Sequence, residues 1–161
     1  KLFQNVPSNQ LISFLKATLP TTSYFLYLYK EVGQKYEWTD WLRSERDELD
    51  SFLTDENVIL YSLILQGEPR GFFVLDYRQL PICDLAYFGL FDDITGKGIG
   101  KLMMNRVFEV VIEQGDVKTL TVNTNTLDHN SALPLYQKAG FNIYKTEDHE
   151  RSAWSQLENE E

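Results

Sequence analysis

The sequence predicts a mixed α/β fold of the α+β type, with a largely antiparallel central sheet flanked by helices. Two apolar segments, residues 57–65 and 70–77, are separated by the turn sequence Gln-Gly-Glu-Pro, which predicts a β-hairpin. Between residues 81 and 146, strand patterns alternate with helix patterns, which is typical of a sheet covered by helices. The chain has 161 residues, of which 43% are hydrophobic, so we expect a single domain, residues 1–161, with its own core.

The N-terminal third is predicted to contain one strand and two helices. A first strand is expected at residues 10–17. Residues 24–32 have the composition of a strand, but a serine before them and Gly33 after them are typical of helix ends, so we predict a helix. A second helix is predicted over residues 44–53, with Ser44 as its N-cap.

The C-terminal half is predicted to contain three strands and two helices. The strands are expected at residues 81–91, 117–124 and 141–146. Helices are expected at residues 98–114 and 130–139, each followed by a glycine. The first of these helices has apolar residues spaced to form one buried face, namely Leu102, Met103, Val107, Val110 and Val111.

Charge and composition exclude several classes of function. The net charge is −9, which disfavours a nucleic-acid partner and suits a cationic substrate such as an amine. One cysteine and two histidines do not make a zinc cluster, so no metal is expected. No apolar run approaches the length of about 18 residues that a membrane span needs, and no secretory signal pattern is present. We therefore expect a soluble, cytoplasmic protein without a membrane partner.

A glycine-rich turn joins the strand at residues 81–91 to the following helix. Residues 95–101 read Thr-Gly-Lys-Gly-Ile-Gly-Lys. Glycines allow a tight turn and a close approach to a ligand, and the free N–H groups at a helix start favour an anion. Lys97 and Lys101 add positive charge, so the turn predicts a pyrophosphate site. The spacing matches neither a Walker loop nor the Gly-x-Gly-x-x-Gly dinucleotide sequence, which disfavours a nucleotide-phosphate-binding protein.

Two stretches of the chain resemble the signature motifs of a known family. Residues 90–102 and 128–141 are similar to the two motifs of the GNAT superfamily of acyl-CoA N-acyltransferases. The similarity is greatest to a bacterial subgroup of mostly unassigned substrate, and it covers residues 57–146 well. The family's Arg/Gln-x-x-Gly-x-Gly/Ala turn falls on Thr95, Gly98 and Gly100, so a threonine replaces the usual Arg or Gln.

This resemblance implies acetyl-CoA as cofactor and assigns residues to it. Strand residues Phe88, Gly89 and Leu90 would offer backbone groups to the pantetheine arm at a point where two neighbouring strands splay apart. His129 and Asn130 lie where the family often has an asparagine that contacts the cofactor. Residues 81–146 would form the cofactor side and the N-terminal third the acceptor side. The turn would bind the pyrophosphate through Thr95, Gly96, Lys97, Gly98, Ile99, Gly100 and Lys101.

Transfer to an amine also needs an acid and a base. Tyr136 matches the family's tyrosine, which protonates the departing thiolate. An alkylamine is mostly protonated at neutral pH, so a base must take its proton, and Asp84 is the leading candidate because a carboxylate in an apolar strand has a raised pKa. Asp76 is the first alternative base and a candidate for substrate binding, and Glu37 and Asp40 are further alternatives for the base. Trp38 and Trp41 are candidates for the acceptor pocket, with core packing as the alternative role for each.

Three hypotheses for function follow from these features. The first is an N-acetyltransferase that moves an acetyl group from acetyl-CoA to a primary amine by direct attack in a ternary complex. The second is a non-catalytic acyl-CoA-binding sensor or regulatory module, and the third is a nucleotide-phosphate-binding protein. The acceptor is expected to be a small-molecule or peptide amine, and the resemblance is also compatible with a homodimer.

Overall fold

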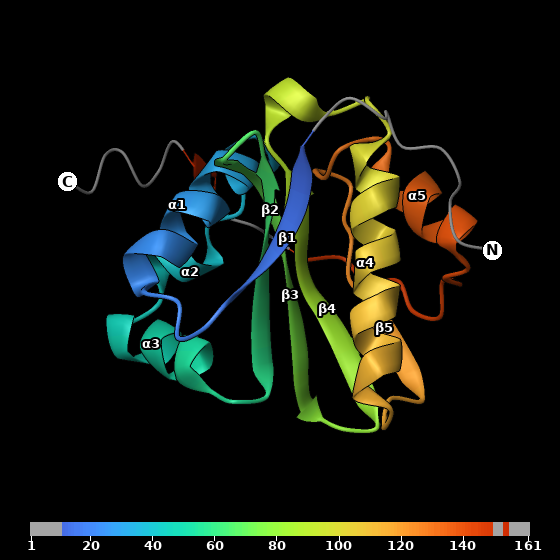
Figure 1. Cartoon of the computed structure of the whole chain (residues 1–161), viewed down its shortest axis with the longest axis horizontal. Coiled ribbons are helices and arrows are strands. Elements are labelled where there is room, and N and C mark those ends of the chain that lie inside the picture. Colours follow the sequence, from blue (N-terminus) through green and yellow to red (C-terminus); the bar gives the residue numbers. More distant parts are fainter. Residues whose placement is uncertain (1–10, 150–152, 155–161) are drawn as a thin grey trace.

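The computed structural model describes residues 11–149 and 153–154. Within them, a five-stranded sheet lies between two groups of helices (Figure 1). The strands are β1 (Ile12–Ala17), β2 (Val58–Leu65), β3 (Glu68–Gln79), β4 (Ile82–Leu90) and β5 (Thr119–Val122). The helices are α1 (Thr22–Gly33), α2 (Asp40–Arg43), α3 (Arg46–Thr54), α4 (Ile99–Gln114) and α5 (Ala132–Ala139). Two short 3₁₀ turns are η1 (Gln34–Tyr36) and η2 (Asp92–Ile94).

The strands follow one another in the order β1-β2-β3-β4-β5. The first four pair as antiparallel neighbours, and β5 pairs with β4 in parallel. The predicted mixed and largely antiparallel sheet is therefore confirmed. The parallel step arises because α4 connects β4 to β5 and returns the chain to the same end of the sheet.

Each face of the sheet carries its own hydrophobic core, because side chains alternate along the strands. Figure 1 shows α1, α2 and α3 on one face and α4 and α5 on the other. The core beneath α4 includes Phe73, Leu75, Cys83, Leu85, Met103 and Val107. The core beneath α1 and α3 includes Phe25, Leu28, Leu49, Phe72 and Val74.

The helices agree with the predictions except at some ends. The apolar segment before Gly33 is helix α1, and the hydroxyl of Thr21 caps it by accepting the N–H of Tyr24 at 3.2 Å. The prediction that Ser44 caps the next helix is wrong. Its hydroxyl instead donates to the carbonyl of Asp40 at 3.0 Å and so closes α2, and α3 begins at Arg46.

The strand predicted at residues 141–146 is wrong. Residues 141–149 have no regular secondary structure, and the side chains of Ile143 and Tyr144 are 63% and 82% exposed. A strand needs a hydrogen-bonded neighbour, and among the described residues β5 pairs with β4 alone. Residue 10 of the predicted first strand lies outside the described residues.

None of the helices in the described ranges is long and apolar enough to cross a membrane.

Candidate active site

Strands β4 and β5 separate part-way along their length. They remain paired until Leu85 opposes Val122, where β5 ends. β4 continues to Leu90 and stays paired with β3 on its other side. Among the described residues, no strand pairs with β4 on its β5 side at Phe88, Gly89 and Leu90, so an extended ligand can lie along this edge.

A cavity of about 380 Å³ lies at this separation. Its walls come from β4, the turn before α4, the loop between β5 and α5, α5 itself, and the end of α1 with η1. Several predicted site residues line it: Trp38, Phe88, Gly89, Leu90, Thr95, Gly96, Gly98, Gly100, Lys101, His129 and Tyr136. The other predicted site residues do not line it: Trp41, Asp76, Asp84, Lys97, Ile99 and Asn130.

The glycine-rich turn presents backbone N–H groups to this cavity. Gly96 and Gly98 have φ angles of 75° and 79°, and a Cβ on either would meet nothing within 4 Å. Among the described residues no side chain caps the N-terminus of α4. The N–H of Lys101 donates to the carbonyl of Gly98 at 3.2 Å, so the hydrogen-bonding capacity of the first turn rests on the N–H groups of Ile99 and Gly100. An uncapped helix start beside an open glycine turn fits a pyrophosphate group.

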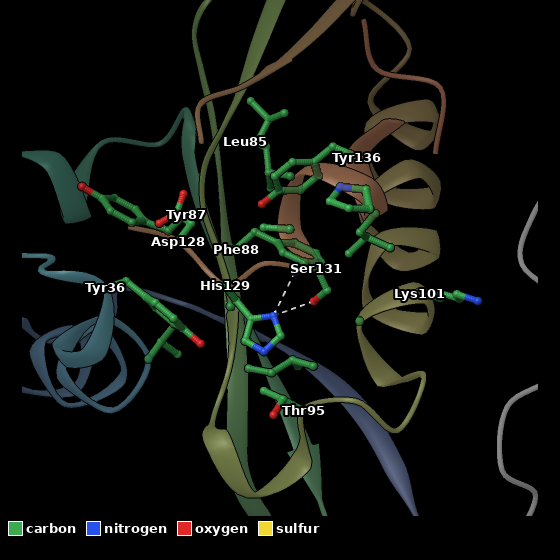
Figure 2. A pocket seen from close by; sticks show the side chains of 18 of the residues that line it. Tyr36, Leu85, Tyr87, Phe88, Thr95, Lys101, Asp128, His129, Ser131 and Tyr136 are labelled. Atoms are coloured by element: carbon green, nitrogen blue, oxygen red, sulfur yellow. Dashed lines mark hydrogen bonds between the residues drawn. The ribbon is translucent and has the colours of Figure 1, made fainter. Parts of the chain in front are cut away.

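The two lysines of the turn contribute less charge to the cavity than the sequence suggests. The ammonium of Lys97 donates to the carbonyl of Asp93 at 2.8 Å, within the turn itself. Lys101 lines the cavity, but Figure 2 shows its side chain extending away from the labelled residues of the pocket. The hydroxyl of Thr95 donates to the carbonyl of Asp92 at 2.9 Å. The backbone groups of the turn, rather than these side chains, therefore have the geometry that would bind an anion.

Tyr136 projects from α5 into the wall of the cavity beside β4 (Figure 2). Its ring packs edge-on against Phe88 and Phe141, with centroid distances of 6.0 and 5.9 Å. Burial, and to a smaller extent the charge of Asp128, raises the pKa of the Tyr136 hydroxyl above its ordinary value. The phenol is therefore protonated at neutral pH, as an acid must be.

Asp84 and Asp76 lie opposite each other on β4 and β3, away from the cavity. Asp84 accepts a 2.6 Å hydrogen bond from the hydroxyl of Thr121 on β5. Burial raises the pKa of Asp84, the Thr121 bond partly offsets this, and the charge of Asp76 adds to it. Burial also raises the pKa of Asp76, but hydrogen bonds and charge from Arg78 outweigh it, so this pKa is lowered. Of the two, Asp84 has the electrostatics of a base.

The two predicted tryptophans have different positions. Trp38 lines the cavity, and its ring lies 5.6 Å from that of Tyr87. Trp41 packs in the core beneath α1 and α3, with ring centroids 5.1 Å from Phe52 and 6.5 Å from Phe25. Core packing, the alternative role considered for each tryptophan, describes the position of Trp41.

His129 lies on the side of the cavity that faces η1. The backbone N–H of Ser131 donates to His129 Nδ1 at 3.1 Å, so the neutral ring carries its proton on Nε2. The hydroxyl of Ser131 is 2.7 Å from the same nitrogen, and the ring of Tyr36 meets the imidazole edge-on at 6.3 Å. The Nε2–H group is thus the donor that His129 offers to a ligand.

Sequence reasoning missed Asp128, which also lines the cavity. Its carboxylate accepts the indole N–H of Trp38 at 3.3 Å, the hydroxyl of Thr124 at 2.9 Å and the backbone N–H of Asn125 at 3.0 Å. In the sequence, Asp128 directly precedes the predicted site residue His129. The contact with Trp38, 90 positions away, is visible only in the folded chain.

Comparisons with known proteins agree with this geometry. The family model described as "Acetyltransferase (GNAT) family" matches residues 22–141. No curated protein matches the chain.

Three solved structures illustrate the likeness. An aminoglycoside acetyltransferase from an uncultured soil metagenomic sample, in complex with trehalose, has a TM-score of 0.67 at 14% identity over 88% of this chain and 95% of its own. A GNAT family acetyltransferase from Elizabethkingia anophelis with acetyl-CoA bound has a TM-score of 0.60 at 22% identity, over 86% and 80% of the two chains. A ribosomal-protein-alanine N-acetyltransferase from Brucella melitensis biovar Abortus 2308 has a TM-score of 0.64 at 16% identity, over 88% and 100%. At these identities the likeness shows the shared fold.

Proposed function

Because the chain belongs to the acetyltransferase (GNAT) family, we propose that it is an N-acetyltransferase that transfers an acetyl group from acetyl-CoA to a primary amine by direct attack in a ternary complex. The observation that carries the proposal is the meeting of three features at one cavity. These are the unpaired edge of β4, the uncapped N-terminus of α4 and the protonated Tyr136.

The described residues fit acetyl-CoA as the cosubstrate, which supplies the reactive thioester. The open turn at Gly96 and Gly98 and the first N–H groups of α4 would hold its pyrophosphate. The unpaired backbone of Phe88, Gly89 and Leu90 would bind the pantetheine arm, as an added strand does. The Nε2–H of His129 would add a side-chain donor where the family often has an asparagine.

The roles of the reacting groups follow from their surroundings. Tyr136 would donate its proton to the departing sulfur, and the backbone N–H of Leu90 would stabilise negative charge on the carbonyl oxygen. Asp84 would act as base through a water molecule, since it does not reach the cavity directly. The N-terminal third would form the acceptor side, which the lining residues Tyr36 and Trp38 support.

Kinetics of two conservative variants test these roles. We expect Tyr136→Phe and Asp84→Asn each to lower kcat by about 10²-fold, the usual contribution of a general acid or base, with little change in CoA affinity. Tyr144→Phe is a matched control, because this tyrosine is 82% exposed and does not line the cavity. If both variants retain full turnover on an acceptor that the wild-type protein acetylates, the assigned roles are wrong.

A non-catalytic acyl-CoA sensor is the second candidate. The position of Asp84 outside the cavity wall favours it, because the alternative bases Asp76, Glu37 and Asp40 do not line the cavity either. Thiol release from acetyl-CoA, measured across a panel of amines, separates the two functions. Steady release with an amine excludes a pure sensor, whereas tight CoA binding without release with any amine supports one.

A further inference from the structure

We propose that Asp128 is the acceptor-binding carboxylate, which holds one protonated amino group of an acceptor with several amino groups inside the aromatic part of the cavity, while a different amino group of the same acceptor is deprotonated and attacks. This inference rests on the proposed function and narrows its substrate class. It concerns a residue that the sequence analysis did not assign to the site.

The carboxylate of Asp128 is fixed in place by three donors that carry no charge. Oδ2 accepts the hydroxyl of Thr124 and the backbone N–H of Asn125, at 2.9 and 3.0 Å. Oδ1 accepts the indole N–H of Trp38 at 3.3 Å. In the described part of the chain no lysine or arginine pairs with Asp128, so its negative charge is not neutralised. A rigid carboxylate with its full charge is suited to bind a cation.

Aromatic rings surround this carboxylate on the acceptor side. Tyr36, Trp38 and Tyr87 all line the cavity. The indole of Trp38, which donates to Asp128, has its ring 5.6 Å from that of Tyr87, and the ring of Tyr36 lies 6.3 Å from that of His129. An ammonium group is attracted to the faces of such rings as well as to the carboxylate. A neutral hydroxyl can donate a hydrogen bond to the carboxylate, but it gives up an equivalent bond to water and gains no attraction between opposite charges, so its net affinity is small.

The negative charge of Asp128 affects the pKa of a tyrosine on each of two opposite walls of the cavity. After burial, its charge is the next cause that raises the pKa of Tyr136 on α5. After burial and the charge of Asp92, it also raises the pKa of Tyr36 on η1. A cation that enters between these walls would therefore be attracted to Asp128, in a chain whose net charge is −9.

The rival explanation is that Asp128 merely closes its own loop through Thr124 and Asn125. Two variants separate the roles. Asp128→Asn keeps an oxygen acceptor and removes the charge, whereas Thr124→Val removes a loop hydrogen bond and keeps the charge. A loop role predicts similar damage from both variants, and a cation-binding role predicts a selective loss in Asp128→Asn.

A titration followed by the indole resonance of Trp38 measures the binding directly. The full chain has three tryptophans, so its indole N–H signals are few, and Trp38→Phe assigns the relevant one. The cationic probes are 1,5-diaminopentane and kanamycin, and 1,5-pentanediol is the uncharged match for the diamine. We expect saturable shifts with both cations and none with the diol. Binding should be at least about tenfold weaker in Asp128→Asn, the usual effect of losing one charge-assisted hydrogen bond, and within about threefold of wild type in Thr124→Val.

Four results would overturn the inference. These are no response of wild type to either cation, an equal response to the diol, unchanged binding in Asp128→Asn, or an equal loss in Thr124→Val. If Asp128→Asn does not fold, the comparison of diamine with diol in wild type decides alone.

A thermal shift with acetyl-CoA on the same samples tests the cosubstrate site separately. One outcome is that acetyl-CoA binds and free thiol is released with the neutral arylamine aniline as acceptor, while the Trp38 resonance does not respond to the cations. This outcome contradicts the present inference and leaves the proposed function standing. Failure of acetyl-CoA to bind removes the proposed function itself.

Discussion

At the scale of single residues, a comparison of Gly98 with Gly115 distinguishes the effect of backbone conformation from the effect on ligand binding. Its φ of 79° favours glycine, and it stands directly before α4 at the cavity. Gly115 ends the same helix with a φ of 84°, and a Cβ on either glycine would meet nothing within 4 Å. The two positions therefore share a conformation and differ in their distance from the anion site.

Alanine at each glycine gives the first prediction. Gly98→Ala and Gly115→Ala should each lower the free energy of unfolding by about 1 kcal/mol, because the left-handed conformation is costly for an L-residue. Only Gly98→Ala should also weaken acetyl-CoA binding, by about tenfold, since a displaced turn loses backbone hydrogen bonds to the pyrophosphate. Calorimetric titration and urea unfolding measure the two effects, and equal CoA affinity in both variants contradicts the anion site.

The paired carboxylates Asp84 and Asp76 give a second prediction, with opposite signs. The fold raises the pKa of Asp84, so the native state holds this proton more tightly than the unfolded state. Its contribution to stability is greatest below the ordinary pKa of about 3.8 and falls as the pH rises through the raised pKa. For Asp76 the pKa is lowered, so its contribution is present above the ordinary pKa and is lost as the pH falls.

Urea unfolding between pH 2 and pH 8 tests these signs, because the Asp76 contribution changes below the ordinary pKa of about 3.8 and the Asp84 contribution changes above it. Relative to wild type, Asp84→Asn should gain stability as the pH rises, whereas Asp76→Asn should lose it, since its partner Arg78 no longer faces a charge. The gain in stability of Asp84→Asn at high pH should be accompanied by a loss of kcat, because a group that acts in catalysis often lowers the stability of the fold. A parallel pH response of the two variants would show that the opposite shifts are not present in solution.

At the scale of elements, the contact of α1 with β4 sets one wall of the cavity. A Cβ on Gly89 would lie 2.1 Å from Cγ1 of Val32, and Val32 is 3% exposed. Valine is a stiff side chain with few alternative rotamers, so it has little freedom to move aside. Helix and strand therefore approach closely because position 89 has no side chain.

A double-mutant cycle is the third prediction. Gly89→Ala should destabilise the protein by about 1–3 kcal/mol through overpacking. Val32→Ala removes the clashing methyl groups, so the double variant should be more stable than the sum of the single effects by about 1 kcal/mol or more. Additive effects in urea unfolding would mean that the helix and strand are not in this contact.

The elements also show where sequence patterns were sufficient and where they failed. Ser23 and Gly33 predicted α1 against its strand-like composition, although the observed N-cap is Thr21, Ser23 lies inside the helix, and Gly33 is itself helical with a φ of −88°. The stretch 141–146 has strand composition but no regular structure. Composition describes a residue's fit to a sheet, whereas a strand exists only where a neighbour supplies hydrogen bonds.

At the scale of the whole molecule, the cavity joins two parts of the chain that lie far apart in sequence. The hydrogen bond between Trp38 and Asp128 and the ion pair between Lys35 and Asp92 both connect the segment after α1 to the C-terminal half. The ion pair is exposed and contributes little. A ligand that contacts both parts should therefore stabilise the whole fold by mass action.

Thermal unfolding with ligand is the fourth prediction. Acetyl-CoA at about 100 times its Kd should add about 2.7 kcal/mol, which raises Tm by roughly 5–10 °C in a domain of this size. ATP at the same concentration should give a smaller shift, because it shares the phosphates but lacks the arm that pairs with β4. A larger shift with ATP would favour the nucleotide-phosphate-binding hypothesis.

The sequence by itself determined the mixed sheet, the glycine turn before α4 and the tyrosine on α5, because these features depend on neighbouring residues and short spacings. Only the tertiary structure decided which residues share the cavity. It brought Trp38 into contact with Asp128 and packed Trp41 in the core beneath α1 and α3. It placed Asp84 outside the set of residues that line the cavity. The physical reason is that local backbone preferences are written in adjacent residues, whereas the direction of a side chain and its distant partners depend on how sheet and helices pack together.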